Sequence, residues 1–527
     1  MKLTFLHFLC FFSFFQILSA QIVSLDPTFG TDGKVVNNFY VNDDVSGAVT
    51  IQDDGKILVC GLKSFSINGN VYLARYNVNG SLDINFGNNG IVFTPLTTES
   101  GGNRIMKLLP NGKILVSGSK SSSNNLNYFD FATARYNSDG SIDTTFGTNG
   151  IVITDINGNG NEANGIDVQS DGKIIVAGNT YINGIVSMDV FTTLVRYLPD
   201  GTIDTTFGTD GKVVLNLLVP NSEQYLWDIK ILPDDSILLG VTTTALETND
   251  FFKNIAILKV NSDGTSDTTF GTNGAVITDF GAQDILYAID EYQGTILMAG
   301  YSRYPNYRMI VSKYLSNGAL DATFGIGGKV ITNKDATSLY DGLFGMKVQP
   351  NGKILCSGWT GDLGAMDALL IQFNTDGTID TGFNGTGFIT TDFDAIDNSN
   401  FSFATQPDGK IVCTGRKGVD NNYDSTLIRY DVAALATAQF SKTDLFSVFP
   451  NPFTDRITLN IRLKTTESLS ADLFDFNGRK IQNLFQKTIF PSGSNTTEIQ
   501  MLESLANGVY FMRVFNGTTN TTLKIIK

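Results

Sequence analysis

One short block of sequence recurs seven times along this chain. Each copy has an aspartate followed three residues later by a phenylalanine, usually with glycine next. The copies are Asp26/Phe29, Asp83/Phe86, Asp143/Phe146, Asp204/Phe207, Asp267/Phe270, Asp321/Phe324 and Asp380/Phe383. Successive aspartates lie 54 to 63 residues apart. A fixed period of this size indicates one supersecondary unit stacked repeatedly, and it constrains the whole fold.

Each repeat holds four short strand signals. Two other blocks keep the same phase: a tight Gly-Lys turn before an apolar run, and a basic-aromatic pair such as Arg75-Tyr76. In the first repeat the expected strands are Gly33–Phe39, Ala48–Gln52, Lys56–Gly61 and Tyr72–Asn77. No window keeps a helical period. The sequence predicts an all-β chain whose main part is a seven-bladed β-propeller of four-stranded blades. A solenoid, the competing layout, would need terminal caps.

The repeated aspartate block has a structural interpretation. Aspartate can accept hydrogen bonds from backbone amides two residues on, glycine supplies a positive φ, and phenylalanine can fill the space between blades. A catalytic residue is needed once, so sevenfold repetition favours a scaffold role. Ser141–Gly147 is similar to the Asp-box turn of sialidase-type propellers, which joins the third and fourth strands of a blade. That resemblance implies that Gly33–Phe39 is an outermost strand, which completes the seventh blade with residues 401–431 and closes the ring.

The same phase sorts the connections between strands. The uniform turns fall on one face of the disc, and the variable connections fall on the other face, where binding usually resides. One set of variable loops is rich in aromatic residues mixed with Asn, Asp and Ser. From it we select the candidate ligand-binding residues Tyr128, Tyr181, Tyr304, Tyr307, Trp359 and Tyr423.

Residues 25–430 carry tandem copies of Leu-Asp-x-Thr-Phe-Gly-x-x-Gly-Lys-Val, Gln-x-Asp-Gly-Lys-Ile and Arg-Tyr-Asn-x-Asp-Gly. In these motifs the chain resembles the delta-60 repeat family. The fifth and sixth repeats depart most from the pattern, at Lys259-Val260 and Gly294-Thr295. The resemblance implies a propeller-like fold in an extracellular bacterial protein, with no shared enzymatic activity.

Four motifs follow one another in the last segment. They are Phe446–Phe453, Leu473–Lys480, Leu505–Val514 and Lys524–Lys527. Together they resemble the type A C-terminal sorting domain of the type IX (Por) secretion system. The resemblance implies an immunoglobulin-like β-sandwich that the type IX machinery carries across the outer membrane of a Bacteroidetes-type bacterium, and that a surface sortase removes. Short alternating strands also fit a small sandwich. An ordinary binding sandwich that stays attached is the alternative.

The N-terminus has the pattern of a secretory signal. Lys2 precedes an apolar run from Leu3 to Leu18, and small residues follow before Gln21. The expected organisation is a signal peptide at 1–20, the propeller at 21–431, a linker at 432–445 and the sorting domain at 446–527. No other stretch is long and apolar enough for a transmembrane helix. We therefore expect a secreted or outer-membrane-surface protein without a transmembrane segment, and a monomer.

Composition removes several classes of function. The one histidine is His7, so the chain after the signal segment has none for a catalytic relay, a general base or metal ligation. Acidic residues outnumber basic ones 52 to 37 and the net charge is −15, which disfavours nucleic acid as a partner. Cys60, Cys356 and Cys413 lie in apolar runs without paired spacing, so we expect buried thiols rather than disulfides.

Two kinds of chemistry stay open. Asp155, Asn157 and Asn159 form the first half of an oxygen-ligand loop, so Ca²⁺ is a candidate cofactor. Ile166 stands where an EF-hand has glutamate, and an ordinary Gly/Asn turn is the alternative; no other cofactor is expected. Paired carboxylates could hydrolyse glycosides. The loop carboxylates that could take part are Glu162, Glu223, Glu247, Asp250 and Asp362, although no spacing singles out a pair.

Three functions follow from these observations. The favoured one is a non-catalytic propeller that binds a glycan or a protein through its variable face, since aromatic rings stack on sugars while amides bind hydroxyls. The second is a carboxylate-dependent glycan-degrading hydrolase, which one close carboxylate pair in a deep pocket would favour. The third is a passive structural component of the envelope or matrix.

Overall fold

The computed structural model divides the chain into two compact units, Met1–Leu435 and Ala436–Lys527. The structure describes residues 21–39, 44–63, 70–94, 96, 105–121, 129–183, 188–216, 222–244, 253–303, 306–335, 337–362, 364–394, 397–419, 422–434, 446–475, 480–502, 505, 508–516 and 520–527. Strands and turns account for these residues, and no helix occurs among them. The all-β prediction is confirmed.

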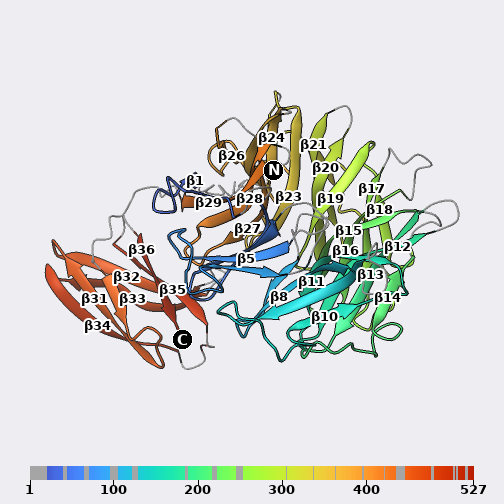
Figure 1. The fold of residues 1–527 in the computed structure, drawn as a ribbon. Coiled ribbons are helices and arrows are strands. Elements are labelled where there is room, and N and C mark those ends of the chain that lie inside the picture. Colours follow the sequence, from blue (N-terminus) through green and yellow to red (C-terminus); the bar gives the residue numbers. More distant parts are fainter. Residues whose placement is uncertain are drawn as a thin grey trace, which may run out of the picture. The chain divides into compact units, whose positions relative to one another are not determined.

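The first unit consists of seven antiparallel blades, numbered 1 to 7 in chain order, of which blades 5 and 6 are joined into one eight-stranded sheet (Figure 1). Blade 1 has β3 (Asp44–Ile51), β4 (Ile57–Lys63), β5 (Asn70–Tyr76) and β6 (Ile91–Thr94); blade 2 has β7 (Met106–Leu108), β8 (Ile114–Ser121), β9 (Phe129–Tyr136) and β10 (Ile151–Thr154); blade 3 has β11 (Gly160–Val168), β12 (Ile174–Asn183), β13 (Met188–Tyr197) and β14 (Lys212–Leu215). In each blade the second strand is buried along nearly its whole length because other blades cover both of its faces.

Blades 4 to 6 repeat this order. Blade 4 has β15 (Gln224–Ile231), β16 (Ile237–Thr243), β17 (Asn254–Val260) and β18 (Ala275–Thr278); blade 5 has β19 (Gln283–Tyr292), β20 (Thr295–Arg303), β21 (Tyr307–Tyr314) and β22 (Lys329–Thr332); blade 6 has β23 (Tyr340–Val348), β24 (Ile354–Asp362), β25 (Ala365–Phe373) and β26 (Phe388–Thr391). One parallel pair, Tyr307 opposite Tyr340, also joins blades 5 and 6.

Blade 7 is assembled from distant parts of the chain. It contains β27 (Asp397–Thr405), β28 (Ile411–Val419), β29 (Asn422–Ala434) and the N-terminal strands β1 (Gln21–Leu25) and β2 (Lys34–Asn37). In β2, Lys34 pairs with Ile428 of β29, which confirms the predicted closure. β27 packs against β3 of blade 1, so the ring is complete. The predicted seven-bladed propeller is therefore confirmed.

β1 extends the propeller beyond its expected end. Gln21 pairs with Ala434, so β29 continues through Val432–Ala434, three residues that the sequence placed in a linker. The difference arises because β1 supplies backbone hydrogen-bond partners that hold this segment extended. The rest of the expected linker, 435–445, lies outside the described residues, as does the expected signal peptide at 1–20.

The aspartate block joins the third and fourth strands, as predicted. In blade 2, the Asp143 carboxylate accepts the N–H of Thr145 at 3.2 Å, and Phe146 is fully buried against blade 3. Gly147 has a φ of 52°, and its N–H donates to the carbonyl of Asp200 in blade 3 at 2.8 Å. The block thus shapes the turn and ties each blade to the next.

The two basic blocks of the repeat neutralise this aspartate. Arg135 Nε donates to Asp143 at 2.6 Å, and Lys113 of the Gly-Lys turn reaches the same oxygen at 2.6 Å. The Arg135 guanidinium also lies 4.6 Å above the centre of the Phe146 ring and donates to the carbonyl of Pro199 in blade 3. Arg135 and Asp143 are both buried, so each needs the other's charge.

The aromatic residue of the basic-aromatic pair links a blade to the one before it. Tyr197 of blade 3 shares a 2.7 Å hydrogen bond with Thr154 of blade 2, and the same Tyr–Thr pair recurs at other interfaces. Blade 4 departs from this pattern with Val260, which is matched by Leu215 instead of threonine in blade 3. Both are buried in one apolar cluster, so the irregular repeat keeps its packing.

The second unit is a β-sandwich. Its sheets are β30 (Phe446–Phe449), β31 (Arg456–Leu463) and β34 (Gly493–Gln500), and β33 (Lys480–Phe490), β32 (Glu467–Asp475), β35 (Val509–Phe515) and β36 (Asn520–Ile526). Alternate residues such as Leu459, Leu473 and Met512 form the core between them. This arrangement agrees with the predicted sandwich.

Cys60, Cys356 and Cys413 are buried free thiols, which confirms their predicted state. Within the described part of the chain, no helix is long and apolar enough to cross a membrane.

Candidate functional site

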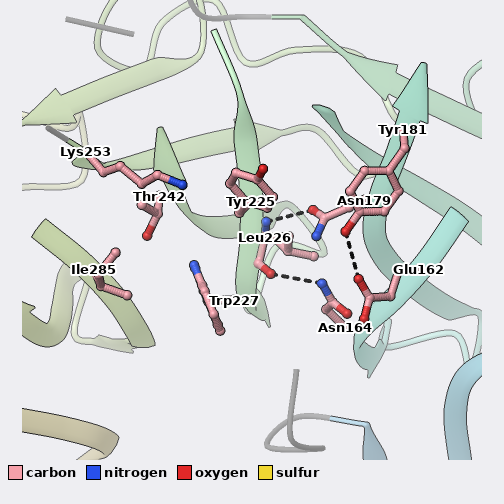
Figure 2. Close-up of a pocket in the computed structure, with 10 residues that line it drawn as sticks. All are labelled: Glu162, Asn164, Asn179, Tyr181, Tyr225, Leu226, Trp227, Thr242, Lys253 and Ile285. Carbon is pink, nitrogen blue, oxygen red and sulfur yellow. Dashed lines mark hydrogen bonds between the residues drawn. The ribbon is translucent and has the colours of Figure 1, made fainter. Parts of the chain in front are cut away.

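A pocket of about 290 Å³ lies at the variable-loop ends of blades 3, 4 and 5 (Figure 2). The described residues that line it are Glu162, Asn164, Asn179, Tyr181, Tyr225, Leu226, Trp227, Thr242, Lys253 and Ile285. They come from the first strands of the three blades, from the ends of second strands, and from the residue before β17. The pocket therefore opens on the face that the sequence assigned to binding.

A wider hollow of about 710 Å³ lies among the uniform turns of blades 1 to 3. Its lining includes the exposed turn residues Asp53 and Asp54, and no aromatic ring is among the described residues that line it. A hollow formed by turn residues of the scaffold offers less for recognition than the aromatic pocket.

The aromatic pocket exists because of a repeated irregularity in the innermost strands. Each first strand of blades 1, 3, 4, 5, 6 and 7 has a β-bulge at an equivalent place. The bulged residues are Gly47, Asn164, Trp227, Tyr287, Phe344 and Phe401. The corresponding residue of blade 2, Arg104, lies outside the described residues. A bulge redirects its side chain, so this position can differ freely between blades.

Four consecutive bulged residues form a chain of ring contacts, which we call the aromatic arc: Trp227, Tyr287, Phe344 and Phe401. Each ring centre lies 4.4–4.6 Å from a neighbouring aromatic ring, and the successive contacts between bulged residues are all 4.6 Å. Asn164 occupies this position in blade 3, where an amide replaces the ring. The arc ends at Trp227 of blade 4. The pocket lies beside Asn164, the bulged residue of blade 3, where a further ring would continue the arc.

Polar groups around the pocket are held in place by backbone partners. Leu226 N–H donates to Asn179 Oδ1 at 2.8 Å, and Asn164 Nδ2 donates to the Leu226 carbonyl at 3.2 Å. Tyr181 O–H donates to Glu162 Oε2 at 2.8 Å. Asn164 Oδ1 and Trp227 Nε1 are buried without a hydrogen-bond partner among the described residues. Unpaired buried polar atoms are costly, and native proteins usually have a reason to keep them.

Lys253 is the cation of the pocket. Its ammonium lies 4.5 Å from the centre of the Tyr225 ring and 3.7 Å from the Glu223 carboxylate. The side chain is 22% exposed, so a ligand can reach it. Asp284 N–H donates to the Lys253 carbonyl at 2.8 Å and anchors its backbone to blade 5.

The structure separates the six aromatic candidates of the sequence. Tyr181 lines the pocket. Tyr307 and Trp359 contact Tyr301 at 5.3 and 5.2 Å in the packing around the aromatic arc. Trp359 and Tyr423 are only 7% and 6% exposed because they lie in β24 and β29, which extend further than the expected loops. The last two candidates, Tyr128 and Tyr304, lie outside the described residues.

The candidate calcium loop is occupied by protein contacts. Gly158 N–H donates to the Asp155 carboxylate at 2.9 Å, and the ammonium of Lys212 donates to the Asp155 carbonyl at 2.8 Å. Lys329 and Asp279 repeat the same contact between blades 5 and 4 at 3.0 Å. No cluster of three acidic, cysteine or histidine residues suited to a metal occurs among the described residues. Calcium at Asp155, Asn157 and Asn159 stays a prediction.

The carboxylate candidates are spread apart. Glu162 lines the pocket, Glu223 pairs with Lys253 beside it, and Asp362 lies exposed at the end of β24. Glu247 and Asp250 lie outside the described residues. Glu162 is the one carboxylate among the ten described lining residues.

Sequence reasoning missed Tyr225 and Trp227 because it searched the loops, and it passed over Asn164, the last residue of an expected variable loop, because it selected aromatic residues. These residues lie within β15 and β11, at the start of repeats. Alignment of the repeats on their Gly-Lys turns would place five of the six bulged residues in one column, eight residues before the turn, and Tyr287 one residue nearer to it; Asn164 stands directly before the run of aromatic residues. That column carries the signal.

The geometry defines the class of this protein: a seven-bladed β-propeller of tandem repeats, closed by its N-terminal strands and followed by a β-sandwich. Residues 447–527 match the secretion system C-terminal sorting domain. Residues 52–86, 109–146, 169–207 and 349–383 match the family described as domain of unknown function (DUF5122) beta-propeller. The chain thus contains DUF5122 β-propeller repeats and a type IX secretion C-terminal sorting domain. That domain indicates export to the cell surface or extracellular space of a Bacteroidetes bacterium.

Similar solved structures share low identity with the chain. PorZ, an essential surface component of the type IX secretion system of Porphyromonas gingivalis, is 13% identical with a TM-score of 0.37; the alignment covers 91% of this chain and 58% of PorZ. An ulvan lyase of polysaccharide lyase family PL25 is 13% identical over 74% of this chain and 95% of its own, with a TM-score of 0.44. The β-propeller domain of the Trilobed protease from Pyrococcus furiosus is 11% identical over 73% and 95%, with a TM-score of 0.36. No curated protein matches the sequence.

Asp284, which anchors Lys253, makes stability depend on pH. Burial raises its pKa from 3.8 to about 7. The folded protein keeps this proton up to about pH 7 whereas the unfolded chain releases it near 3.8, so stability falls as pH rises between these values. We expect Asp284→Asn to raise the melting temperature at pH 8 by about 2–5 °C and to leave it unchanged at pH 4. Thermal unfolding at both pH values checks this, with the exposed turn variant Asp408→Asn as control; an equal shift at both would contradict it.

Proposed function

We propose that this protein is a non-catalytic binding module that recognises a saccharide in the pocket between blades 3, 4 and 5. The observation that carries the proposal is the open space beyond the end of the aromatic arc at Trp227. At the bulge position of blades 4 to 7 a protein ring packs against its neighbour, whereas at Asn164 the space is an open pocket. A sugar ring presents a flat apolar face for Tyr225 or Trp227 and hydroxyls for the surrounding amide and carboxylate groups.

Hydrolysis is the less favoured function. Glycosidases of the common type place two carboxyl groups about 5–10 Å apart on either side of the scissile bond. Glu162 lines the pocket and already accepts the hydroxyl of Tyr181, while the nearby Glu223 is paired with Lys253. Neither carboxylate has a second one opposite it among the described lining residues. A protein ligand and a passive structural role are the remaining alternatives.

A glycan array with the chain from Gln21 to Lys527, in calcium and again in EDTA, tests the proposal. We expect a discrete set of bound glycans and a loss of affinity of at least about tenfold in Trp227→Ala, because an aromatic contact and an indole N–H are removed. Tyr307→Ala is the matched control, since Tyr307 is aromatic but lies outside the pocket lining. Absence of glycan binding would overturn the proposal; loss in EDTA would support calcium at Asp155.

Processing belongs to the same proposal. We propose that residues 1–20 are removed during export and that a surface sortase removes 446–527, which leaves the propeller as the working part. The mass of the exported protein tests both cleavages, and a full-length product would contradict them.

A further inference from the structure

The pocket has a donor side and an acceptor side. Figure 2 shows Lys253 and the indole nitrogen of Trp227 toward one side, and Glu162 with Asn164 toward the other. A ligand that satisfies both sides must carry acceptors at one end and donors at the other. The arrangement therefore sets the polarity of the ligand as well as its shape.

The donor side combines a charge with an unused N–H. The Lys253 ammonium is held over the Tyr225 ring at 4.5 Å, and its partner Glu223 is 31% exposed at 3.7 Å, a distance at which the pair is loose. Trp227 Nε1 has no hydrogen-bond partner in the part of the chain that the structure describes. Ammonium and indole groups only donate, so they suit a carboxylate or sulfate oxygen.

The acceptor side is built from fixed oxygens. Glu162 is 8% exposed, and the hydroxyl of Tyr181 orients its carboxylate. Asn164 is 4% exposed. Its Nδ2 donates to the Leu226 carbonyl, and its Oδ1 has no partner within the described ranges. These oxygens suit hydroxyl donors and would repel an anionic group placed beside them.

We propose that the saccharide is acidic, with its anionic substituent, a carboxylate or a sulfate ester, directed at Lys253 and its hydroxyls directed at Glu162 and Asn164. This inference rests on the proposed function and names the class of its ligand. The chain carries a net charge of −15, so long-range attraction does not supply the preference. The contact at Lys253 supplies it, and raising the salt concentration weakens it.

The test compares each acid with its neutral counterpart. Oligosaccharides of galacturonate, glucuronate, mannuronate and guluronate are titrated by calorimetry into the chain from Gln21 to Lys527, each beside its methyl ester, with a sulfated galactan and its desulfated form as a further pair. We expect at least one acid to bind about tenfold more tightly than its neutral form, the equivalent of 1.4 kcal/mol. Which pair responds distinguishes carboxylate from sulfate.

Variants locate the preference. Lys253→Met should bring the acid-to-neutral affinity ratio close to one while the neutral form still binds, and Lys253→Arg should keep the ratio. An unchanged ratio in Lys253→Met, or neutral forms that bind as tightly as the acids, overturns the inference. Binding of only neutral glycans also overturns it but leaves the proposed function standing, whereas no binding of any glycan overturns both.

Discussion

Removal of residues 21–39 should abolish the cooperative unfolding of the propeller. The deletion takes β1 and β2 from β29, and with them Asp26 and the fully buried Phe29. Arg429, only 3% exposed, then loses the carboxylate that it contacts at 2.8 Å. An uncompensated buried charge costs about 3–5 kcal/mol, and loss of a buried phenylalanine costs about as much again. The two costs together are comparable to the whole free energy of unfolding of many domains.

Thermal unfolding followed by circular dichroism checks this expectation. The parent should show a sharp transition, and the deletion variant a broad one or none. A synthetic peptide of residues 21–39 should restore the transition in part, because the strand pairs with β29 through its backbone. Removal of residues 446–527 is the control, since it takes no strand from any blade. A deletion variant that melts like the parent would show that the closure contributes little.

Replacement of Asp143 by alanine should lower the stability by about 3–5 kcal/mol, because Arg135 stays buried without a counter-charge. Asp380 offers a matched comparison within the same protein. It is equally buried and contacts Lys353 at 2.6 Å, but Gln372 replaces the arginine of the repeat. Lys353 is 26% exposed and water can solvate it, so Asp380→Ala should cost markedly less.

Urea unfolding measures both losses of stability, and equal losses would refute the argument from the buried arginine.

The same groups govern the stability of the protein in acid. Burial alone would raise the pKa of Asp143, but hydrogen bonds from Lys113, Thr145 and Arg135 hold it well below its usual value. A lowered pKa contributes stability above pH 3.8 that is lost as pH falls below it. The Asp143→Ala variant should therefore be less sensitive to acid than the parent.

The local chemistry of the repeat explains why much of the fold could be predicted. The aspartate that accepts an amide two residues on, the glycine with positive φ and the buried phenylalanine act within a few residues of one another. The resemblance of Ser141–Gly147 to the Asp-box turn then gave the strand phase, and this phase predicted that β2 pairs with β29. The packing of the irregular repeats was harder to predict, because the contact of Val260 with Leu215 depends on residues of two different blades.

The residues of the candidate site were harder to predict from the sequence than the fold. Tyr181, near the end of β12, was found because the sequence placed it in a variable loop. Trp227 and Asn164 become site residues only through the bulges of their strands. Trp359 and Tyr423 were chosen for the same reason as Tyr181, yet they pack inside the protein. A sequence shows which side chains are aromatic, but the neighbouring blade decides whether a ring is covered.

The sequence by itself determined the number of blades, their strand order, the closure by an N-terminal strand and the sorting domain. These features depend on residues that recur at a fixed period or stand together in one motif, so each copy repeats the same local physics. Only the tertiary structure decided where the pocket lies. Its walls come from three blades, and its space exists because the bulged residue of blade 3 is Asn164 while that of blade 4 is Trp227. Whether a side chain fills the space between two blades depends on volumes and directions that meet only after the ring has closed.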